Sequence, residues 1–172
     1  MAELRAIVKY VGPETEVKVE HALELPKEFK TFENLKTSDV EGRQALYYLK
    51  NRGLTKDDIL KYNIGYCTSG RYRNMVIIPS YDANGSLNYF TGRSFEKEPY
   101  TKYRNPEASR DIVPFELFIN WNIPIILCEG PFDAIAIKRN VIPLLGKNIQ
   151  SNWMKKIVTS AVEKIYIALD KD

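Results

Sequence analysis

The stretch IPIILCEGPFDAIAIKRNVIPLL, residues 123–145, decides the fold of this chain. It alternates short apolar runs with a segment of helical character, and this alternation continues to residue 169. The expected elements are strands at 123–128, 141–145 and 164–169 and helices at 132–139 and 151–162. Nearly continuous apolar strands separated by helices are typical of a parallel sheet with crossover connections. The last third of the chain is therefore predicted to be a parallel α/β unit.

Acidic residues stand just after two of these strands. Glu129 follows the first strand, and Asp170 and Asp172 follow the third. The carboxyl ends of parallel strands form one edge, and two aspartates two residues apart point to the same side. If the third strand lies beside the first, the three carboxylates converge. They then repel one another unless a cation binds between them. Carboxylate oxygen ligands favour Mg²⁺ or Mn²⁺. Gly130 leaves room for a ligand, and Asp133 can support the site from behind.

Solvated loop charges are the alternative interpretation of these acidic residues. Each of them alone is more often such a charge than a metal ligand. Their combination at the ends of two strands favours the metal site.

The sequence before residue 123 indicates a mixed α+β region. One short helix is expected to be capped by Ser38 or Asp39 and ended by Gly53, and a Thr55–Asp58 capping box opens a second. Two strands joined by a tight turn come next, and a short amphipathic helix leads into the parallel unit. The expected ranges are strands at 75–80 and 86–95, a turn at 82–85 and a helix at 114–121.

Basic residues are concentrated in one block of the sequence. The net charge is only +3, and the surplus lies within residues 71–110. Its members are Arg71, Arg73, Arg93, Lys97, Lys102, Arg104 and Arg110. A basic block on a neutral background predicts a binding site for a polyanion. Aromatic residues interleave with these charges and are candidates for stacking on bases, with packing inside the hairpin as the alternative: Tyr72, Tyr89, Phe90, Tyr100 and Tyr103.

Several classes of protein are excluded. No apolar run approaches the ~20 residues of a membrane span, and no signal-peptide core stands at the N-terminus. Cys67 and Cys128 are isolated and His21 is the single histidine, so no zinc site is expected within this chain. The glycine-lysine pair at 146–147 lacks the spacing of a P-loop. We expect a cytoplasmic protein with reduced thiols and no membrane contact.

The order of short motifs resembles a known family. EGPFD at 129–133, followed by Asp170 and Asp172, is similar to the Toprim signature of bacterial-type primases, topoisomerases and some nucleases. Upstream stand YLKNRGL at 48–54, IGY at 64–66, RYRN at 71–74, TGR at 91–93 and KYRNPE at 102–107. This succession resembles the RNA-polymerase domain of bacterial and phage DNA primases of the DnaG type, from about residue 40 to residue 172.

The resemblance implies a fold and a division of the chain. It implies an α/β protein whose α+β N-terminal subdomain precedes the first half of a Toprim, Rossmann-like parallel sheet. The expected regions are an N-terminal hairpin and linker at 1–36, a subdomain with a basic ridge at 37–122, and an incomplete Toprim subdomain at 123–172. The family's zinc module, the rest of the Toprim sheet and a helical subdomain are missing. We therefore expect a fragment of a longer primase. One alternative is that this fragment makes no primer by itself although the longer protein does.

The resemblance also implies a function and a site. The family makes short RNA primers on single-stranded DNA from NTPs. The resemblance implies that the complete protein holds two Mg²⁺ or Mn²⁺ ions through the catalytic residues that correspond to Glu129, Asp170 and Asp172. Template and triphosphate would contact a basic ridge of Arg71, Arg73, Arg93, Lys102 and Arg104. A replicative helicase would bind through regions outside this chain. A Toprim-type nuclease or topoisomerase-like enzyme, and a non-catalytic single-stranded DNA-binding fragment, stay open as alternatives.

Overall fold

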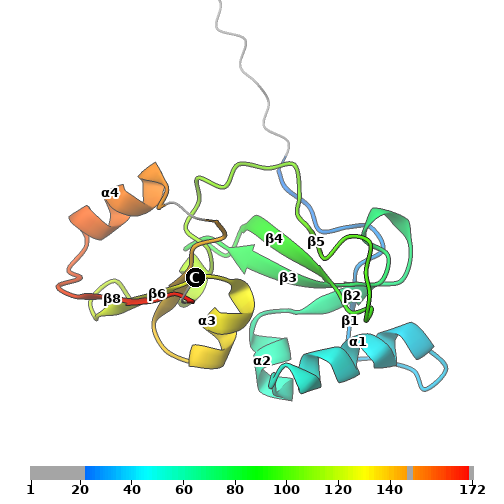
Figure 1. Cartoon of the computed structure of the whole chain (residues 1–172). Helices are drawn as coiled ribbons and strands as arrows, with labels where there is room; N and C mark the ends of the chain where they lie inside the picture. The colour runs from blue at the N-terminus through cyan, green and yellow to red at the C-terminus, as the bar shows by residue number, and fades with distance from the viewer. Residues whose placement is uncertain (1–21, 147–148, 171–172) are drawn as a thin grey trace, which may run out of the picture.

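Two sheets make up the computed structural model, which describes residues 22–146 and 149–170 (Figure 1). The predicted N-terminal hairpin and Asp172 lie outside the described residues. The antiparallel sheet has the order β1-β2-β3-β4-β5, and the parallel sheet has the order β7-β6-β8. The antiparallel strands are β1 (Lys30–Thr31), β2 (Gly65–Cys67), β3 (Met75–Tyr81), β4 (Leu87–Ser94) and β5 (Tyr103–Arg104). The parallel strands are β6 (Ile125–Cys128), β7 (Val141–Pro143) and β8 (Ile165–Ala168).

Four of the predicted helices form, and the two for which caps were predicted have them. The four helices are α1 (Val40–Asn51), α2 (Lys56–Lys61), α3 (Pro131–Ile137) and α4 (Ser151–Thr159). Asp39 caps α1 by accepting a hydrogen bond from the backbone of Gly42 at 2.7 Å. Thr55 and Asp58 form the capping box of α2, with the Thr55 backbone donating to the Asp58 carboxylate at 2.8 Å. These caps satisfy backbone donors that the first helical turn would otherwise leave free.

Strand β3 is the centre of the antiparallel sheet and is covered on both faces. Val76 and Ile78 point into one hydrophobic cluster, which lies on the side of α1 and α2. Met75 and Ile77 point into another, to which Leu23, Leu25 and Phe29 contribute from the N-terminal segment. This alternation follows from the two-residue repeat of a strand, and it makes β3 apolar from Met75 to Pro79 although the sheet is antiparallel.

The parallel sheet places the first strand of the unit in the middle. β7 and β8 both pair with β6, with Cys128 opposite Pro143 on one side and Ala168 on the other. The third strand therefore lies beside the first, which was the condition for bringing the acidic strand ends together. The predicted fold class, α/β with an α+β region followed by a parallel sheet, is confirmed.

One hydrophobic cluster joins the two sheets. It combines Ala45 and Leu49 of α1 with Cys128 of β6 and Ile135 of α3. An ion pair between the Lys138 ammonium and the Asp58 carboxylate, at 3.2 Å, crosses the same junction. Residues on both sides of the predicted boundary at 122 and 123 thus share a core, and the boundary itself stays a prediction.

The helix predicted at 114–121 is wrong. The structure has only a 3₁₀ turn there, at Glu116–Phe118. Phe115 precedes it in the left-handed region, with φ of 59°, and its backbone N–H donates to the Ser80 hydroxyl at 2.9 Å. The buried Glu116 carboxylate accepts a hydrogen bond from Lys156 of α4. These long-range contacts fix the segment as a turn and override its local helical pattern.

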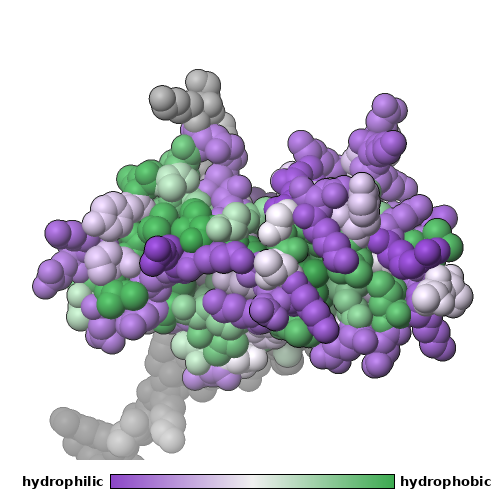
Figure 2. Space-filling view, turned by 90° about the horizontal axis from the view of Figure 1, so that it is seen from below, coloured by the Kyte–Doolittle hydropathy of each residue, from purple (hydrophilic) through white to green (hydrophobic). Residues whose placement is uncertain are grey.

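Strand β8 and part of α4 leave apolar side chains at the surface. All four residues of β8 are exposed. Hydrophobic side chains reach the surface in the left half of Figure 2, the side on which β8 and α4 lie in Figure 1. The exposed members of these two elements include Met154, Val158, Ile165, Tyr166 and Ile167. Within the described residues, no helix is long and apolar enough to cross a membrane.

Candidate functional site

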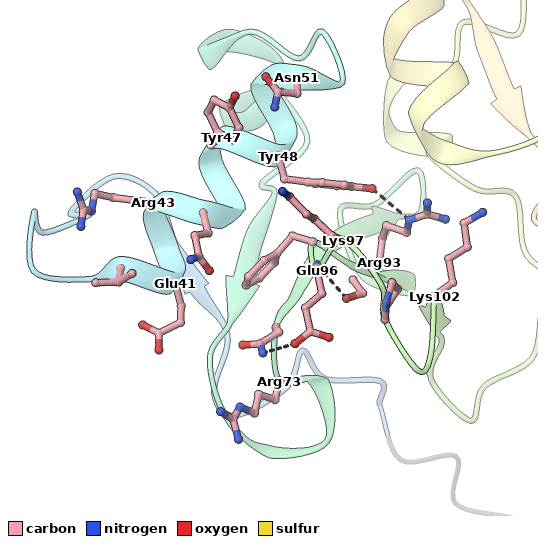
Figure 3. Close-up of a pocket in the computed structure, with 16 residues that line it drawn as sticks. Glu41, Arg43, Tyr47, Tyr48, Asn51, Arg73, Arg93, Glu96, Lys97 and Lys102 are labelled. Carbon is pink, nitrogen blue, oxygen red and sulfur yellow. Dashed lines mark hydrogen bonds between the residues drawn. The ribbon is translucent and has the colours of Figure 1, made fainter.

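An open cleft of about 1300 Å³ lies between α1 and the end of β4 with the loop that follows it (Figure 3). Its α1 wall includes Gln44 and Tyr48, and its opposite wall carries most of its positive charge. The basic side chains that line the cleft are Arg43, Arg73, Arg93, Lys97 and Lys102. Two carboxylates, Glu41 and Glu96, line it as well. The cleft is therefore a predominantly basic surface, suited to an anionic ligand.

Arg93 is the most unusual side chain of the cleft because it is charged yet only 7% exposed. Its Nε donates a hydrogen bond to the Tyr48 hydroxyl at 3.1 Å, and its guanidinium carbon lies 4.3 Å from the centre of the Tyr103 ring. The second contact follows from the register, in which Arg93 of β4 is paired with Tyr103 of β5. Its Nη1 is buried and has no hydrogen-bond partner within the part of the chain that the structure describes.

The chain packs closely around Arg93. A side chain at the preceding Gly92 would place its Cβ 2.5 Å from the backbone oxygen of Arg104. Glycine at this position therefore lets β5 approach β4 and brings Tyr103 over the guanidinium group. The TGR sequence at 91–93 thus places an arginine beside a position that needs glycine for close packing.

Lys102 extends toward the same side of the cleft as Arg93 (Figure 3). Within the described part of the chain, no carboxylate forms an ion pair with either of them. Glu96 is engaged elsewhere, accepting a hydrogen bond from the Asn74 amide at 2.8 Å. The Arg93 and Lys102 side chains thus lie on the same side of the cleft, and no described carboxylate forms an ion pair with either.

The predicted basic ridge is split by the structure. Arg73, Arg93 and Lys102 line one cleft, whereas Arg71 and Arg104 do not. Arg71 instead forms an exposed ion pair with Glu107, with 2.8 Å between Nη2 and Oε1. Three of the five predicted residues therefore meet in one place.

The interleaved aromatic residues divide in the same way. Tyr72, Tyr89 and Phe90 are buried, so packing inside the fold accounts for them. Tyr100 and Tyr103 are exposed, and only these two keep faces available for a base.

The cleft residues on α1 were not among the predicted site residues. They include Arg43, Gln44 and Tyr48, on a helix whose buried side carries Ala45 and Leu49. The helical repeat places Gln44 and Tyr48 on one face, four residues apart, and this was the available signal. The helical repeat could not show that this face of α1 lies opposite the end of β4.

The predicted metal ligands lie at neighbouring strand ends. Glu129 directly follows β6, Asp170 lies two residues after β8, and both are exposed. The Asp133 carboxylate accepts a hydrogen bond from the Gly130 backbone at 3.0 Å and so caps α3. The described residues contain no group of three acidic, histidine or cysteine side chains that could hold a metal, and Asp172 lies outside them. That Glu129 and Asp170 share an ion stays a prediction.

Cys128, which precedes Glu129, is a structural residue. Burial raises the pKa of its thiol to about 12, and the nearby Asp133 carboxylate acts in the same direction. A thiol of this kind is protonated at neutral pH and is a poor nucleophile or ligand. Cys128 packs in the hydrophobic cluster at the end of β6.

Comparisons with known proteins agree with this fold. No family model matches the chain. In sequence the chain is similar to the DNA primase of Legionella pneumophila, with 28% identity over 149 residues that cover 61% of this chain and 26% of that primase. In fold it is similar to the Aquifex aeolicus primase (zinc-binding and RNA polymerase domains), with a TM-score of 0.64, 23% identity, and coverage of 74% of this chain and 43% of that one. It is also similar to a DnaG primase catalytic domain bound to single-stranded DNA, with a TM-score of 0.66, 19% identity, and coverage of 78% and 56%.

These similarities define the class of protein. The chain has the fold of a primase catalytic core, and the resemblance to DnaG-type DNA primases is confirmed in sequence and in structure. The chain spans between 26% and 56% of the length of these three relatives.

Proposed function

We propose that the chain is part of a DNA primase that makes short RNA primers on single-stranded DNA from NTPs. The observation that carries this proposal is the buried Arg93, which lines an open basic cleft and has no carboxylate partner among residues 22–146 and 149–170. A buried charge without a counter-charge is costly, and a bound phosphate removes that cost through charge-assisted hydrogen bonds. Templates and NTPs both supply phosphates, and the solved primase with bound single-stranded DNA supports this choice.

The proposed reaction is nucleotidyl transfer. The 3′ oxygen of one ribonucleotide forms a bond to the α-phosphorus of the next NTP, its proton is released, and the bond to the leaving pyrophosphate breaks. In such reactions, positioning and neutralisation of charge supply most of the catalysis. Arg93 and Lys102 would bind phosphate oxygens and hold them at the cleft, with arginine suited to contacts through two nitrogens.

Glu129 and Asp170 are the described residues that would hold Mg²⁺ or Mn²⁺, together with Asp172. Their oxygen donors suit these ions, and their positions at the ends of paired parallel strands fit a shared site. When bound, the metal would favour the deprotonated hydroxyl and neutralise charge on the phosphates. Gly130 leaves space beside Glu129, and Asp133 fixes the start of α3 next to it.

Binding of single-stranded DNA tests the cleft directly. With contacts from Arg73, Arg93 and Lys102, the slope of log affinity against log salt is expected near −2, at about 0.7 for each phosphate neutralised. Arg93→Gln should reduce the magnitude of the slope by about 0.7 and weaken binding by roughly tenfold, a loss in the range of one charged hydrogen bond. Arg71→Gln is the matched control, because Arg71 lies outside the cleft and is paired with Glu107. Equal losses in both variants would refute the cleft as the binding site.

Primer synthesis tests the reaction. The chain would be incubated with labelled NTPs, a single-stranded template and Mg²⁺ or Mn²⁺, and compared with the Glu129→Gln variant. We expect the unchanged chain to make an RNA product, and the variant to make it at least about 100 times more slowly. Removal of a group that stabilises a charged transition state lowers rates by about 10²–10³. Cleavage of the template would point to a nuclease instead. DNA binding with no RNA product in either protein would support a non-catalytic DNA-binding fragment. A replicative helicase as partner of the whole protein stays a prediction.

A further inference from the structure

We propose that Tyr48 is a positioning residue that holds Arg93 ready for a phosphate group and ties it to helix α3 beside Glu129. This inference rests on the proposed function and adds a residue to it. Tyr48 comes from α1, Arg93 from β4 and Phe132 from α3, so the contact joins three elements that are distant in sequence.

On one side, the Tyr48 hydroxyl orients the guanidinium group of Arg93. It accepts the Nε hydrogen bond at 3.1 Å, while the guanidinium carbon lies over the Tyr103 ring, 4.3 Å from its centre. A free arginine side chain loses rotamer freedom when a ligand fixes it. The two tyrosines fix Arg93 before any ligand binds, and the buried Nη1 has no partner among the residues that the structure describes. Such an arrangement is preorganised for an anion.

On the other side, the Tyr48 ring contacts the start of α3. Its ring centre lies 6.2 Å from that of Phe132, nearly perpendicular at 82°. The guanidinium carbon of Arg52 lies 5.4 Å from the Tyr48 ring centre and 4.9 Å from the Phe132 ring centre. Phe132 is three residues after Glu129. Tyr48 therefore sets the phosphate-binding arginine at a fixed place relative to the predicted metal ligand.

The hydroxyl and the ring of Tyr48 have separable roles. The ring packs on Phe132, and a phenylalanine at position 48 would keep that contact. The hydroxyl is the part that bonds Arg93. Tyr166 of β8 is exposed, lies outside the cleft, and makes no hydrogen bond within the described part of the chain. Tyr166→Phe is thus a control for the loss of one tyrosine hydroxyl.

The experiment compares Tyr48→Phe with Tyr166→Phe in affinity for a fluorescent oligothymidylate, by anisotropy, and for an NTP, by calorimetry. The two ligands distinguish template phosphate from triphosphate as the group that Arg93 binds. Tyr48→Phe should weaken one or both by about 3- to 10-fold, the range of one hydrogen bond, while the variant still unfolds cooperatively and stays folded at the assay temperature. Tyr166→Phe should have no such effect on either affinity.

A double-mutant cycle separates positioning from packing. In an Arg93→Gln background, Tyr48→Phe should cause no further loss, because its effect acts through Arg93. An equal loss in both backgrounds would overturn the inference, as would normal affinity of Tyr48→Phe when Arg93→Gln binds weakly. In these two cases the proposed function stands. Normal affinity of both Tyr48→Phe and Arg93→Gln would refute the cleft as the phosphate-binding site, and with it the proposed function.

Discussion

Strands β3 and β8 are both short and apolar, yet their surroundings are opposite. β3 pairs with β2 and β4 and is covered on both faces by hydrophobic clusters. β8 pairs with β6 alone among the described strands, and each of its residues is exposed. The hydropathy of a strand therefore does not determine its burial; the elements packed against it do. The antiparallel half is consequently expected to be the stable frame of the molecule, with β8 contributing little to stability.

Truncation of one isoleucine in each strand gives the largest expected difference. Ile77 of β3 is fully buried, whereas Ile167 of β8 is 72% exposed. Ile77→Ala should lower the free energy of unfolding by about 2–5 kcal/mol, because it removes buried methyl groups and leaves a cavity. Ile167→Ala should change it by less than about 0.5 kcal/mol. Urea unfolding measures both, and similar losses would mean that β8 is covered in solution.

Helix caps in the two halves should differ by a smaller amount. At α2, the Thr55 hydroxyl accepts from the Asp58 backbone at 3.2 Å and donates to the Asp58 carboxylate at 2.6 Å. Thr55→Ala should therefore cost about 1 kcal/mol. At α3 the cap residue is Gly130, and Asp133 alone supplies a side-chain bond, so Asp133→Ala should cost about 0.5 kcal/mol. A larger effect at α3 than at α2, measured by thermal unfolding, would contradict this order.

Acid stability should depend on carboxylates of the antiparallel half. The pKa of Asp39 is lowered by hydrogen bonds from the Gly42 backbone and the Tyr66 hydroxyl. Burial alone would raise the pKa of Asp58, but hydrogen bonds from Thr55 and the Lys138 ammonium outweigh it and lower that pKa. Because the unfolded chain takes up these protons first, the stabilisation is present above the ordinary value near 3.8 and is lost as pH falls below it.

The Asp39→Asn variant tests this dependence. It should lose less stability than the unchanged chain between about pH 4 and pH 2, because one of the two titrating groups is gone. Glu163→Gln serves as the control, because Glu163 is exposed and forms no hydrogen bond or ion pair within the described residues. An unchanged acid limb in the Asp39 variant would show that its hydrogen bonds do not contribute to the pH dependence.

Local patterns in the sequence predicted the frame of the fold well. The capping residues of α1 and α2 act within three residues of themselves, and the strands of the parallel unit are marked by local apolar runs. The prediction failed at 114–121, where a buried Glu116 finds its partner Lys156 forty residues away. No short-range pattern carries that information.

The candidate site was predicted only in part for the same reason. Arg73, Arg93 and Lys102 could be found as basic residues in one block, but their separation from Arg71 depends on an ion pair with Glu107. Tyr48 and Arg93 are 45 positions apart, and only the folded chain brings them together. Glu129 and Asp170 could be placed at strand ends, whereas the pairing of β8 with β6 came from the structure.

The shared core beneath α1 has a consequence for how this molecule opens. Since Ala45 and Leu49 pack with Cys128 and Ile135, neither sheet can lose its interior without exposing the other's. Amide protons in β3 and β6 should therefore exchange with deuterium together, in one cooperative event. Two peptides cut between residues 122 and 123 should each expose this face and reassociate through it.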